Sequence, residues 1–279
     1  MDLQTMLKLP REQVRELAPQ TVVWAAGGTR RQAVIEGVDL ASGYYDWSWQ
    51  RQLDGAALFF DLGVRTLFAP ILGPPQAREV GPYREKLFGV LQRLGDDASL
   101  EAYRRMGARV RFYGQQHVPG MADLSARVEA ATRDLGPHTL WWSMVVAHEE
   151  EALWDAMEAG MRAGATSLAA AARAFYGEDV APVDVFIGFG KPQTGYLMPP
   201  LLGERASLYW SVFPSYAMTE EHLRMLFWDY RFGRATWRAD KRRRYDDLLS
   251  SGLVRRYQQP FILGVGQRIG PFWYPWMPE

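Results

Sequence analysis

The sequence predicts an α/β fold in which a mainly parallel sheet is flanked by helices on both faces. Short apolar runs, bounded by turn residues and rich in β-branched or aromatic side chains, recur along the chain and are typical of buried strands. The segments between these runs space their apolar and charged residues as helices do. Because strands that alternate with helices build βαβ units, the strands are expected to run parallel in one sheet.

Six apolar runs are predicted as the strands of this sheet. They span residues 21–25, 64–69, 108–113, 140–147, 183–187 and 207–213. The helical segments between them span residues 46–62, 81–93, 99–106, 123–134 and 149–163. Gly63, Gly107 and Gly164 follow three of these helices, where a C-cap favours glycine. A further helix is predicted from the Thr219 N-cap and its acidic first turn to about Arg231.

Length and composition indicate a folded protein that is rich in aromatic rings. The 279 residues can bury a full core, and a single domain over residues 1–279 is expected, with residues 232–279 as a C-terminal extension. Aromatic residues make up 13% of the chain, which fits either core and interface packing or an apolar pocket whose rings stabilise carbocations. Residues 236–257 are dense in arginine and lysine, as in a solvated helix face, a contact with a partner subunit or, as a minor alternative, a phosphate site.

Charge and cysteine content exclude several classes of function. The formal net charge is zero, so binding to nucleic acid or to a bulk membrane surface is not expected. The chain contains no cysteine, which excludes disulfides, thiolate catalysis and cysteine-bound metal. The first residues lack the apolar run of a signal peptide or a membrane span. A soluble, cytoplasmic protein is therefore expected, without stable membrane insertion.

Motifs for nucleotide cofactors and zinc are incomplete. Gly188 and Gly190 follow a predicted strand, but Pro192 and the lack of a third glycine at the right spacing argue against dinucleotide binding. His148 is followed by three glutamates but lacks the second histidine of a zinc protease, and the other histidines are scattered. Neither a nicotinamide or flavin cofactor nor zinc is expected.

A short segment after the first predicted strand combines glycines with arginines. It reads Gly27, Gly28, Thr29, Arg30 and Arg31. Ligands of open parallel sheets bind beyond the carboxyl ends of the strands, where this segment lies. The glycines let the backbone approach a ligand, and backbone N–H groups with two guanidinium groups suit a diphosphate. Taken by itself, the segment is about equally consistent with a surface turn that carries solvated arginines.

Together with two later segments, this one resembles the cis-prenyltransferases. Those enzymes carry Asp-x-Asn-Gly-Arg-Trp-Ala after their first strand. In the bacterial diterpene synthase branch of tuberculosinol synthase and kolavelool synthase, tuberculosinol synthase has Asp-Gly-Thr-Arg-Arg-Trp there. Residues 185–190 and 207–219 are similar to the Ile-Gly-Phe-Gly, Ser-Leu-Tyr-Phe and Pro-Ser-Tyr-Tyr-Met-Thr segments of that branch. The resemblance runs from about residue 20 to the C-terminus and implies an undecaprenyl diphosphate synthase-like fold and a homodimer.

The same resemblance implies a diphosphate site without the machinery for chain elongation. Arg30 and Arg31 inherit the diphosphate-binding role, while Gly27 stands where the family has its aspartate. Gly188 replaces an arginine that holds a second diphosphate, and Ser207 replaces a magnesium-binding glutamate. Without a carboxylate pair Mg²⁺ cannot be held as elongation requires, so no metal ligand is assigned, and Mg²⁺ would arrive only on the diphosphate itself.

Aromatic residues are expected around the same site. The resemblance aligns Tyr44 with a tyrosine that lines the site of tuberculosinol synthase, where a phenol can bond a phosphate oxygen or orient water. Asp46 is the nearest carboxylate and is the stand-in for the missing aspartate, or else a helix N-cap. Trp47, Tyr209 and Trp210 join Tyr44 as rings expected to shield an allylic cation.

The function implied by the resemblance is that of a diterpene synthase. Its substrate would be a bicyclic diterpenyl diphosphate of the kolavenyl or halimadienyl type, and loss of diphosphate would leave an allylic cation. Water or proton loss would then give an alcohol or an olefin. Two alternatives stay open: transfer of the diterpenyl group to a nucleoside or another acceptor, and a non-catalytic subunit that supports an active partner. The sequence does not determine the ring skeleton, the stereochemistry or the nucleophile.

Overall fold

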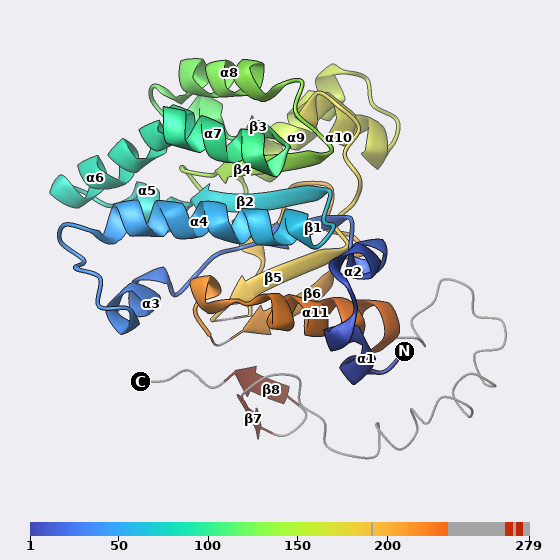
Figure 1. Ribbon diagram of the computed structural model, residues 1–279. Helices are drawn as coiled ribbons and strands as arrows, with labels where there is room; N and C mark the ends of the chain where they lie inside the picture. Colours follow the sequence, from blue (N-terminus) through green and yellow to red (C-terminus); the bar gives the residue numbers. More distant parts are fainter. Residues whose placement is uncertain (191, 212, 234–265, 270–271, 276–279) are drawn as a thin grey trace.

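A six-stranded sheet lies at the centre of the molecule, with helices on both of its faces (Figure 1). The computed structural model describes residues 1–190, 192–211, 213–233, 266–269 and 272–275. The strand order is β3-β4-β2-β1-β5-β6, and all neighbouring strands in this sheet run parallel. The predicted α/β class is therefore confirmed.

All six predicted strands are present, with ends shifted by a few residues. They are β1 (Thr21–Trp24), β2 (Thr66–Leu72), β3 (Ala108–Tyr113), β4 (His138–Met144), β5 (Val185–Phe189) and β6 (Ser207–Ser211). In this order β1 is central, because it pairs with β2 on one side and with β5 on the other. Loops that follow β1 and β5 therefore emerge side by side at the carboxyl edge of the sheet.

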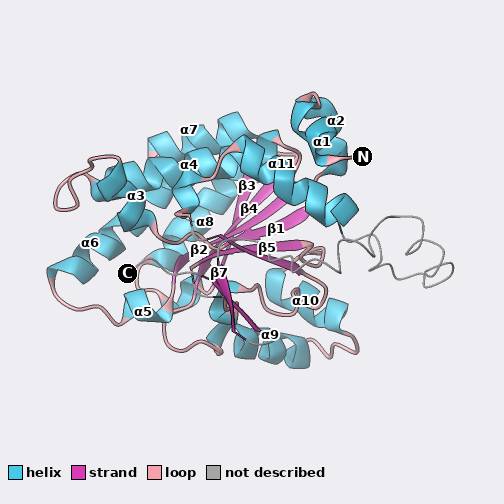
Figure 2. Cartoon of the chain, turned by 90° about the horizontal axis from the view of Figure 1, so that it is seen from below, coloured by secondary structure: helices cyan, strands magenta, loops and turns pink. Residues whose placement is uncertain are grey.

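The helices form two layers, one on each face of the sheet (Figure 2). The larger layer contains α4 (Tyr44–Asp61), α6 (Pro82–Leu91), α7 (Asp97–Met106), α8 (Met121–Thr132) and α11 (Glu220–Trp228). The opposite face is covered by α9 (Glu151–Arg162) and α10 (Leu168–Tyr176). No helix in the described part of the chain has the length and apolar character needed to cross a bilayer.

Several short elements were not predicted. They are α1 (Leu3–Lys8), α2 (Arg11–Leu17), α3 (Thr29–Ile35), α5 (Pro74–Ala77) and, among the longer ones, α10. The helix that opens at Thr219 continues as a π-helical turn, η5 (Asp229–Gly233), beyond the predicted end at Arg231. In α3 the cause is clear, because Ala33 is its one buried residue, so no apolar period marks the helix.

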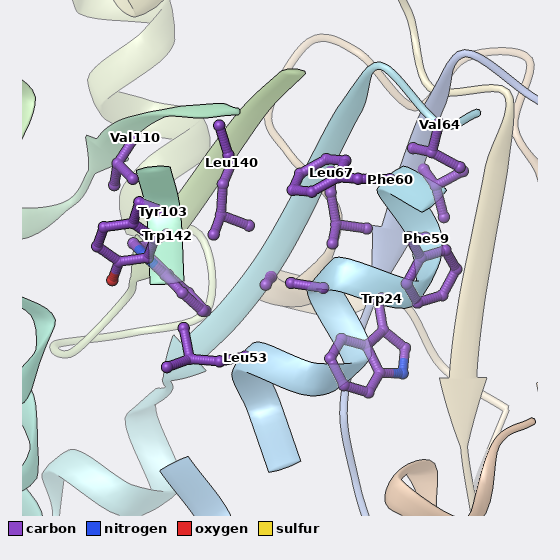
Figure 3. Packing of buried hydrophobic residues seen from close by; sticks show 14 of the residues in the cluster. Trp24, Leu53, Phe59, Phe60, Val64, Leu67, Tyr103, Val110, Leu140 and Trp142 are labelled. Atoms are coloured by element: carbon purple, nitrogen blue, oxygen red, sulfur yellow. The ribbon is translucent and has the colours of Figure 1, made fainter. Parts of the chain in front are cut away.

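The core consists of two clusters, one on each face of the sheet. On the α4 face, Trp24 of β1 and Trp142 of β4 pack with Leu53 and Phe59 of α4 (Figure 3). On the α9 face, Phe68 and Trp141 are stacked, with ring centroids 5.7 Å apart. Because successive residues of a strand point to opposite faces, Trp141 and Trp142 serve different clusters. Trp24, Trp141 and Trp142 thus serve core packing.

Most of the predicted C-terminal extension lies outside the described residues. Its described parts are residues 232–233 at the end of η5 and the antiparallel pair β7 (Gly266–Ile269) and β8 (Phe272–Pro275). The charge-dense segment 236–257 lies entirely outside the described residues, so its predicted surface, subunit or phosphate contact stays a prediction.

Candidate diphosphate site

The loop after β1 meets the segment after β6. Backbone N–H of Ser215 donates to the carbonyl of Gly27 at 2.9 Å, and the N–H of Gly27 donates to Ser215 Oγ at 3.2 Å. Ser215 begins the short turn η4 (Ser215–Ala217). These bonds join the two segments that carry the family resemblance. They also mean that the Gly27 N–H, which the sequence analysis assigns to the diphosphate, is donated to Ser215.

Gly28 shapes the loop and lets an arginine lie over it. This residue is the N-cap of α3 and has φ 68°, in the left-handed region that favours glycine. A Cβ there would lie 2.9 Å from Nη2 of Arg31 and 3.3 Å from Cα of Pro214. The guanidinium of Arg31 is therefore folded back against the loop, beside the start of η4. Arg31 is one of the two arginines predicted from the sequence to bind the diphosphate.

Thr29 and Tyr44 connect the first residues of α3 and α4. Thr29 Oγ1 and the Tyr44 hydroxyl are hydrogen-bonded at 2.6 Å. The Tyr44 ring contacts Tyr45, with centroids 5.2 Å apart. Burial raises the pKa of Tyr45, and the positive charge of Arg30 opposes this shift. Thr29, Arg30 and Tyr44 thus lie in one neighbourhood, as predicted from the sequence.

A run of aromatic rings leads from this loop toward the core. Trp47 lies 6.3 Å from Tyr44 and 5.5 Å from Tyr216, and Tyr216 lies 6.1 Å from Trp24, all between ring centroids. The Tyr216 hydroxyl donates to Gln52 Oε1 at 3.0 Å. Burial raises the pKa of Tyr216, so it is a neutral phenol at physiological pH. Ser215 and Tyr216 lie in the segment 207–219 that carries the family resemblance, but they are not among the predicted site residues. Their place directly after a predicted strand was the available signal.

A small cavity adjoins this run. It has a volume of about 120 Å³ and is lined by Trp24, Arg51, Asp54, Gly55, Leu58, Phe59, Ser215, Tyr216 and Met218. Its walls are mainly aromatic and aliphatic, while Arg51, Asp54 and Ser215 contribute polar groups. Ser215 places the cavity directly beside the loop of Gly27.

Asp46 pairs with an arginine outside the segment of Gly27 to Arg31. Its carboxylate forms an ion pair with Arg93 of η1 (Gln92–Gly95), and its side chain is 67% exposed. The N-cap of α4 is Gly43, so Asp46 lies in the first turn and is not the cap. Among the described residues, no cluster of three or more histidine, aspartate or glutamate side chains is arranged to hold a metal ion.

A tryptophan side chain occupies the space beside Gly188 that a larger residue would need. It pairs with Trp210 across β5 and β6, and a Cβ at residue 188 would lie 2.5 Å from Nε1 of Trp210 and 2.9 Å from Cε1 of Phe186. An arginine at position 188 therefore has no room while Trp210 keeps this position. The structure thus gives a steric reason why the arginine of elongating relatives has no counterpart at this position, while the absence of a second diphosphate site stays a prediction.

Tyr209 and Trp210 lie on opposite faces of β6. Tyr209 packs against the cluster on the α4 face, and its hydroxyl donates to Asp229 at 2.8 Å. Trp210 packs on the α9 face, with its centroid 5.8 Å from Phe186. The structure therefore does not bring Trp210 together with Tyr44 and Trp47, which lie on the α4 side.

Ser207 and Gly27 also lie apart. Ser207 is the first residue of β6 and pairs with Val185, which in turn pairs with Val22. Gly27 lies five residues after Val22, beyond the carboxyl end of β1, so the two positions are at opposite ends of the strands. The two positions that hold carboxylates in elongating relatives therefore do not converge within one chain.

Solved structures with the same architecture define the class of the fold. Lavandulyl diphosphate synthase from Lavandula x intermedia, solved with dimethylallyl diphosphate, matches with a TM-score of 0.62 at 14% identity, over 78% of this chain and 97% of that one. A probable undecaprenyl diphosphate synthase from Campylobacter jejuni matches with a TM-score of 0.57 at 14% identity, over 77% and 96%. The fold is that of the cis-prenyltransferases, as the sequence resemblance implies.

Two curated proteins place the chain within that class, although no protein-family model matches it. (+)-Kolavelool synthase from Herpetosiphon aurantiacus is 35% identical over 277 residues, which cover 98% of this chain and 95% of the relative. Tuberculosinyl adenosine transferase from Mycobacterium tuberculosis is 27% identical over 243 residues, 82% of each chain. The chain belongs to the diterpene synthase family of cis-prenyltransferase fold that includes (+)-kolavelool synthase, and it is a terpene-synthase-type enzyme.

Proposed function

We propose that the protein ionises a bicyclic diterpenyl diphosphate of the kolavenyl or halimadienyl (tuberculosinyl) type. The allylic carbon–oxygen bond breaks and its electron pair leaves with the diphosphate. Water then bonds to the cation and loses a proton to give an alcohol, or a neighbouring carbon loses a proton to give an olefin. The observation that carries this proposal is the position of Arg31 over a glycine loop that runs into a line of aromatic rings.

The two arginines supply the main electrostatic assistance. Negative charge develops on the leaving oxygen as the bond breaks, and guanidinium groups bind phosphate oxygens with strong, charge-assisted hydrogen bonds. Arg30 and Arg31 occupy the first turn of α3, beside the Gly28 backbone. In this proposal the Tyr44 phenol, held by Thr29, orients a phosphate oxygen or the attacking water.

A protein-bound magnesium ion does not fit these residues. The family's aspartate position is Gly27, and Asp46 is already paired with Arg93. Hard divalent cations need several oxygen ligands, and the described residues offer no group of three or more carboxylate or histidine side chains placed to hold one. We therefore assign no step to a metal held by the protein.

The aromatic run would protect the cation. Faces of tryptophan and tyrosine rings attract positive charge, by about 0.5–2 kcal/mol per contact. Trp47, Tyr216 and Trp24 form this run on the side of the sheet that carries α4. Tyr209 lies in the same face's cluster, whereas Trp210 does not, so we keep Tyr209 and leave Trp210 out of the cation site.

The test is incubation of purified protein with geranylgeranyl, kolavenyl, halimadienyl and copalyl diphosphates, with and without Mg²⁺. Products are read by mass spectrometry and diphosphate release is measured in parallel. Arg30→Ala or Arg31→Ala is expected to lower turnover by on the order of 10²-fold or more. Arg162→Ala is the matched control, because its side chain is 80% exposed on α9, across the sheet. Near-wild-type turnover in both loop variants would contradict the assignment.

A second candidate is transfer of the diterpenyl group to an acceptor molecule. It is favoured by the cavity beside Ser215, where Arg51, Asp54 and Ser215 add polar groups to a mainly apolar wall and the volume of about 120 Å³ suits a compact second molecule. Pockets for drug-sized ligands occupy about 300–1,000 Å³, so this space is small for the whole C20 substrate. Adding nucleosides to the incubation tests the alternative: an adduct mass would establish transfer. Release of no diphosphate from any substrate would instead favour a non-catalytic subunit.

We also propose a homodimer that assembles through α9. Leu153, Trp154, Met157 and Met161 form a stripe at helical spacing on α9, and each is 44–64% exposed. Exposed apolar patches of this kind mark interaction sites. Trp154→Asp is expected to shift the molar mass measured by light scattering from dimer to monomer. A monomeric wild-type protein at micromolar concentration would overturn this proposal.

A further inference from the structure

The helix that carries both arginines has little apolar anchorage. α3 is seven residues long and buries Ala33 alone, while Val34 and Ile35 are 61% and 72% exposed. A helix of this length is not stable by itself in water, so tertiary contacts must hold it. Since apolar burial is small, the direction in which Arg30 and Arg31 project depends on polar contacts at the two ends of α3.

At the C-terminal end of α3 these contacts converge on one carboxylate. Glu36 is the C-cap residue, and its side chain accepts hydrogen bonds from Gln32 Nε2 at 2.9 Å, Trp47 Nε1 at 3.0 Å and Arg51 Nη2 at 2.5 Å. The bonds from Gln32, Arg51 and Trp47 hold the pKa of Glu36 below its usual range. The group is therefore an anion at neutral pH, and it ties α3 to two successive turns of α4.

Trp47, one of the three hydrogen-bond donors to Glu36, belongs to the aromatic run. Trp47 contacts Tyr216 on one side, and the guanidinium carbon of Arg51 lies 5.8 Å from its ring centroid. Tyr216 follows Ser215, which holds Gly27. The contacts thus form a closed frame around the loop: Thr29 with Tyr44 at the start of α3, Glu36 with Trp47 at its end, and η4 between them.

We propose that Glu36 is a positioning residue, which sets the orientation of the two arginines and of the Trp47 ring toward a bound diphosphate. The proposal rests on the proposed function, in which those arginines bind the diphosphate. Glu36 itself does not touch the substrate. Its carboxylate acts through α3 on one side and through the indole on the other, so its loss is expected to affect binding and turnover more than stability.

The first experiment measures binding of inorganic diphosphate by isothermal titration calorimetry. Misoriented guanidinium groups lose part of their charge-assisted hydrogen bonds to phosphate oxygens, so Glu36→Ala is expected to weaken binding by roughly tenfold or more. Glu36→Gln keeps an acceptor for Trp47 but loses the charge opposite Arg51. Its affinity for diphosphate should therefore lie between those of the wild type and of Glu36→Ala. The control is Glu101→Ala, which removes an exposed carboxylate paired with Arg104 on α7. Thermal midpoints of all three variants should lie close together.

A double-mutant cycle tests the route through Trp47. Trp47→Phe removes the Nε1 donor but keeps a ring against Tyr216. If Glu36 acts through this bond, Glu36→Ala should cost less in the Trp47→Phe background than in the wild type. Full additivity of the two losses would overturn the route through Trp47.

The outcomes separate this inference from the proposed function. Wild-type protein that binds diphosphate while both Glu36 variants bind it equally well overturns the positioning role alone. Wild-type protein that binds no diphosphate overturns the proposed function, and the positioning role with it. The inference is supported if turnover rises in the order Glu36→Ala, Glu36→Gln, wild type. The thermal midpoints of the three proteins should stay the same.

Discussion

Gly55 occupies the middle of α4 because an indole fills the space above it. A Cβ at this position would lie 2.2 Å from Cη2 and 2.7 Å from Cζ3 of Trp24. Trp24 is almost fully buried, and its ring packs against Phe59 and Tyr216, with centroids 5.6 Å and 6.1 Å away. Phe59 and Tyr216 therefore limit the movement of the indole on two of its sides. Gly55→Ala tests how tightly α4 is fitted over the sheet beside the candidate site.

Two opposing effects decide the sign of this change. Alanine is favoured over glycine inside a helix by about 1 kcal/mol. Overpacking of a well-packed core typically costs about 1–3 kcal/mol. Carbon atoms pack at about 3.5–4.0 Å, so the ring or the helix would have to move by more than about 1 Å. We therefore take the upper part of the overpacking range and expect the free energy of unfolding to fall by about 2 kcal/mol.

Urea unfolding, followed by circular dichroism, measures this free energy. The matched control is Gly89→Ala in α6, where a Cβ would meet no heavy atom within 4 Å. The control is expected to gain up to about 1 kcal/mol, because it changes helix propensity alone. A Gly55→Ala protein as stable as the wild type would refute the reasoning, and so would an equal loss in both variants.

Two further changes test the Gly28 loop and the ion pair between Glu220 and Arg224 of α11. Gly28→Ala, at φ 68° and 2.9 Å from Arg31 Nη2, should lower the free energy of unfolding by about 1–2 kcal/mol and weaken diphosphate binding. Gly120→Ala, at φ 77° in open space, should match the stability loss but leave binding unchanged; equal binding losses would contradict the role of the loop. Glu220→Gln weakens the two bonds of 2.9 Å and 2.6 Å from the buried Arg224 and should cost about 2 kcal/mol at pH 7. Hydrogen bonds from Arg11 and Arg224 lower the pKa of Glu220, so this stabilisation is present above the ordinary glutamate pKa of about 4.3 and is lost as the pH falls through the lowered value. Urea midpoints of wild type and variant should therefore converge below about pH 4, and a gap that is independent of pH would contradict this pairing.

Features that depend on neighbouring residues along the chain were predictable. The six strands follow from short apolar runs between turn residues, and all six are present. Gly107 was predicted as a C-cap, and it takes φ 57° at the end of α7. The motif of Gly27 to Arg31 was predicted at the carboxyl end of the first strand, and it lies there. Each of these features is determined by backbone conformation and by the local alternation of apolar and polar residues.

Contacts between distant segments were not predictable in the same way. The pairing of Asp46 with Arg93 is one example, and the bond between Gly27 and Ser215 is another. Such contacts depend on which strands become neighbours, and periodicity within a segment carries no information on strand order. The separation of Tyr209 from Trp210 is different, because the period of two in a strand already implies opposite faces.

The sequence by itself determined the α/β class, the family resemblance and the residues of the diphosphate loop. Only the tertiary structure decided how these residues are held. In the strand order β5 lies beside β1 and β6 lies beside β5, so the turn η4 that follows β6 reaches the loop after β1. Helix α3 is too short and too exposed to orient its arginines alone. Their placement is therefore a property of the frame made by Ser215, Tyr44 and Glu36, which lies on three separate elements. Such a frame exists only after the chain has packed, because its bonds join groups that no local pattern brings together.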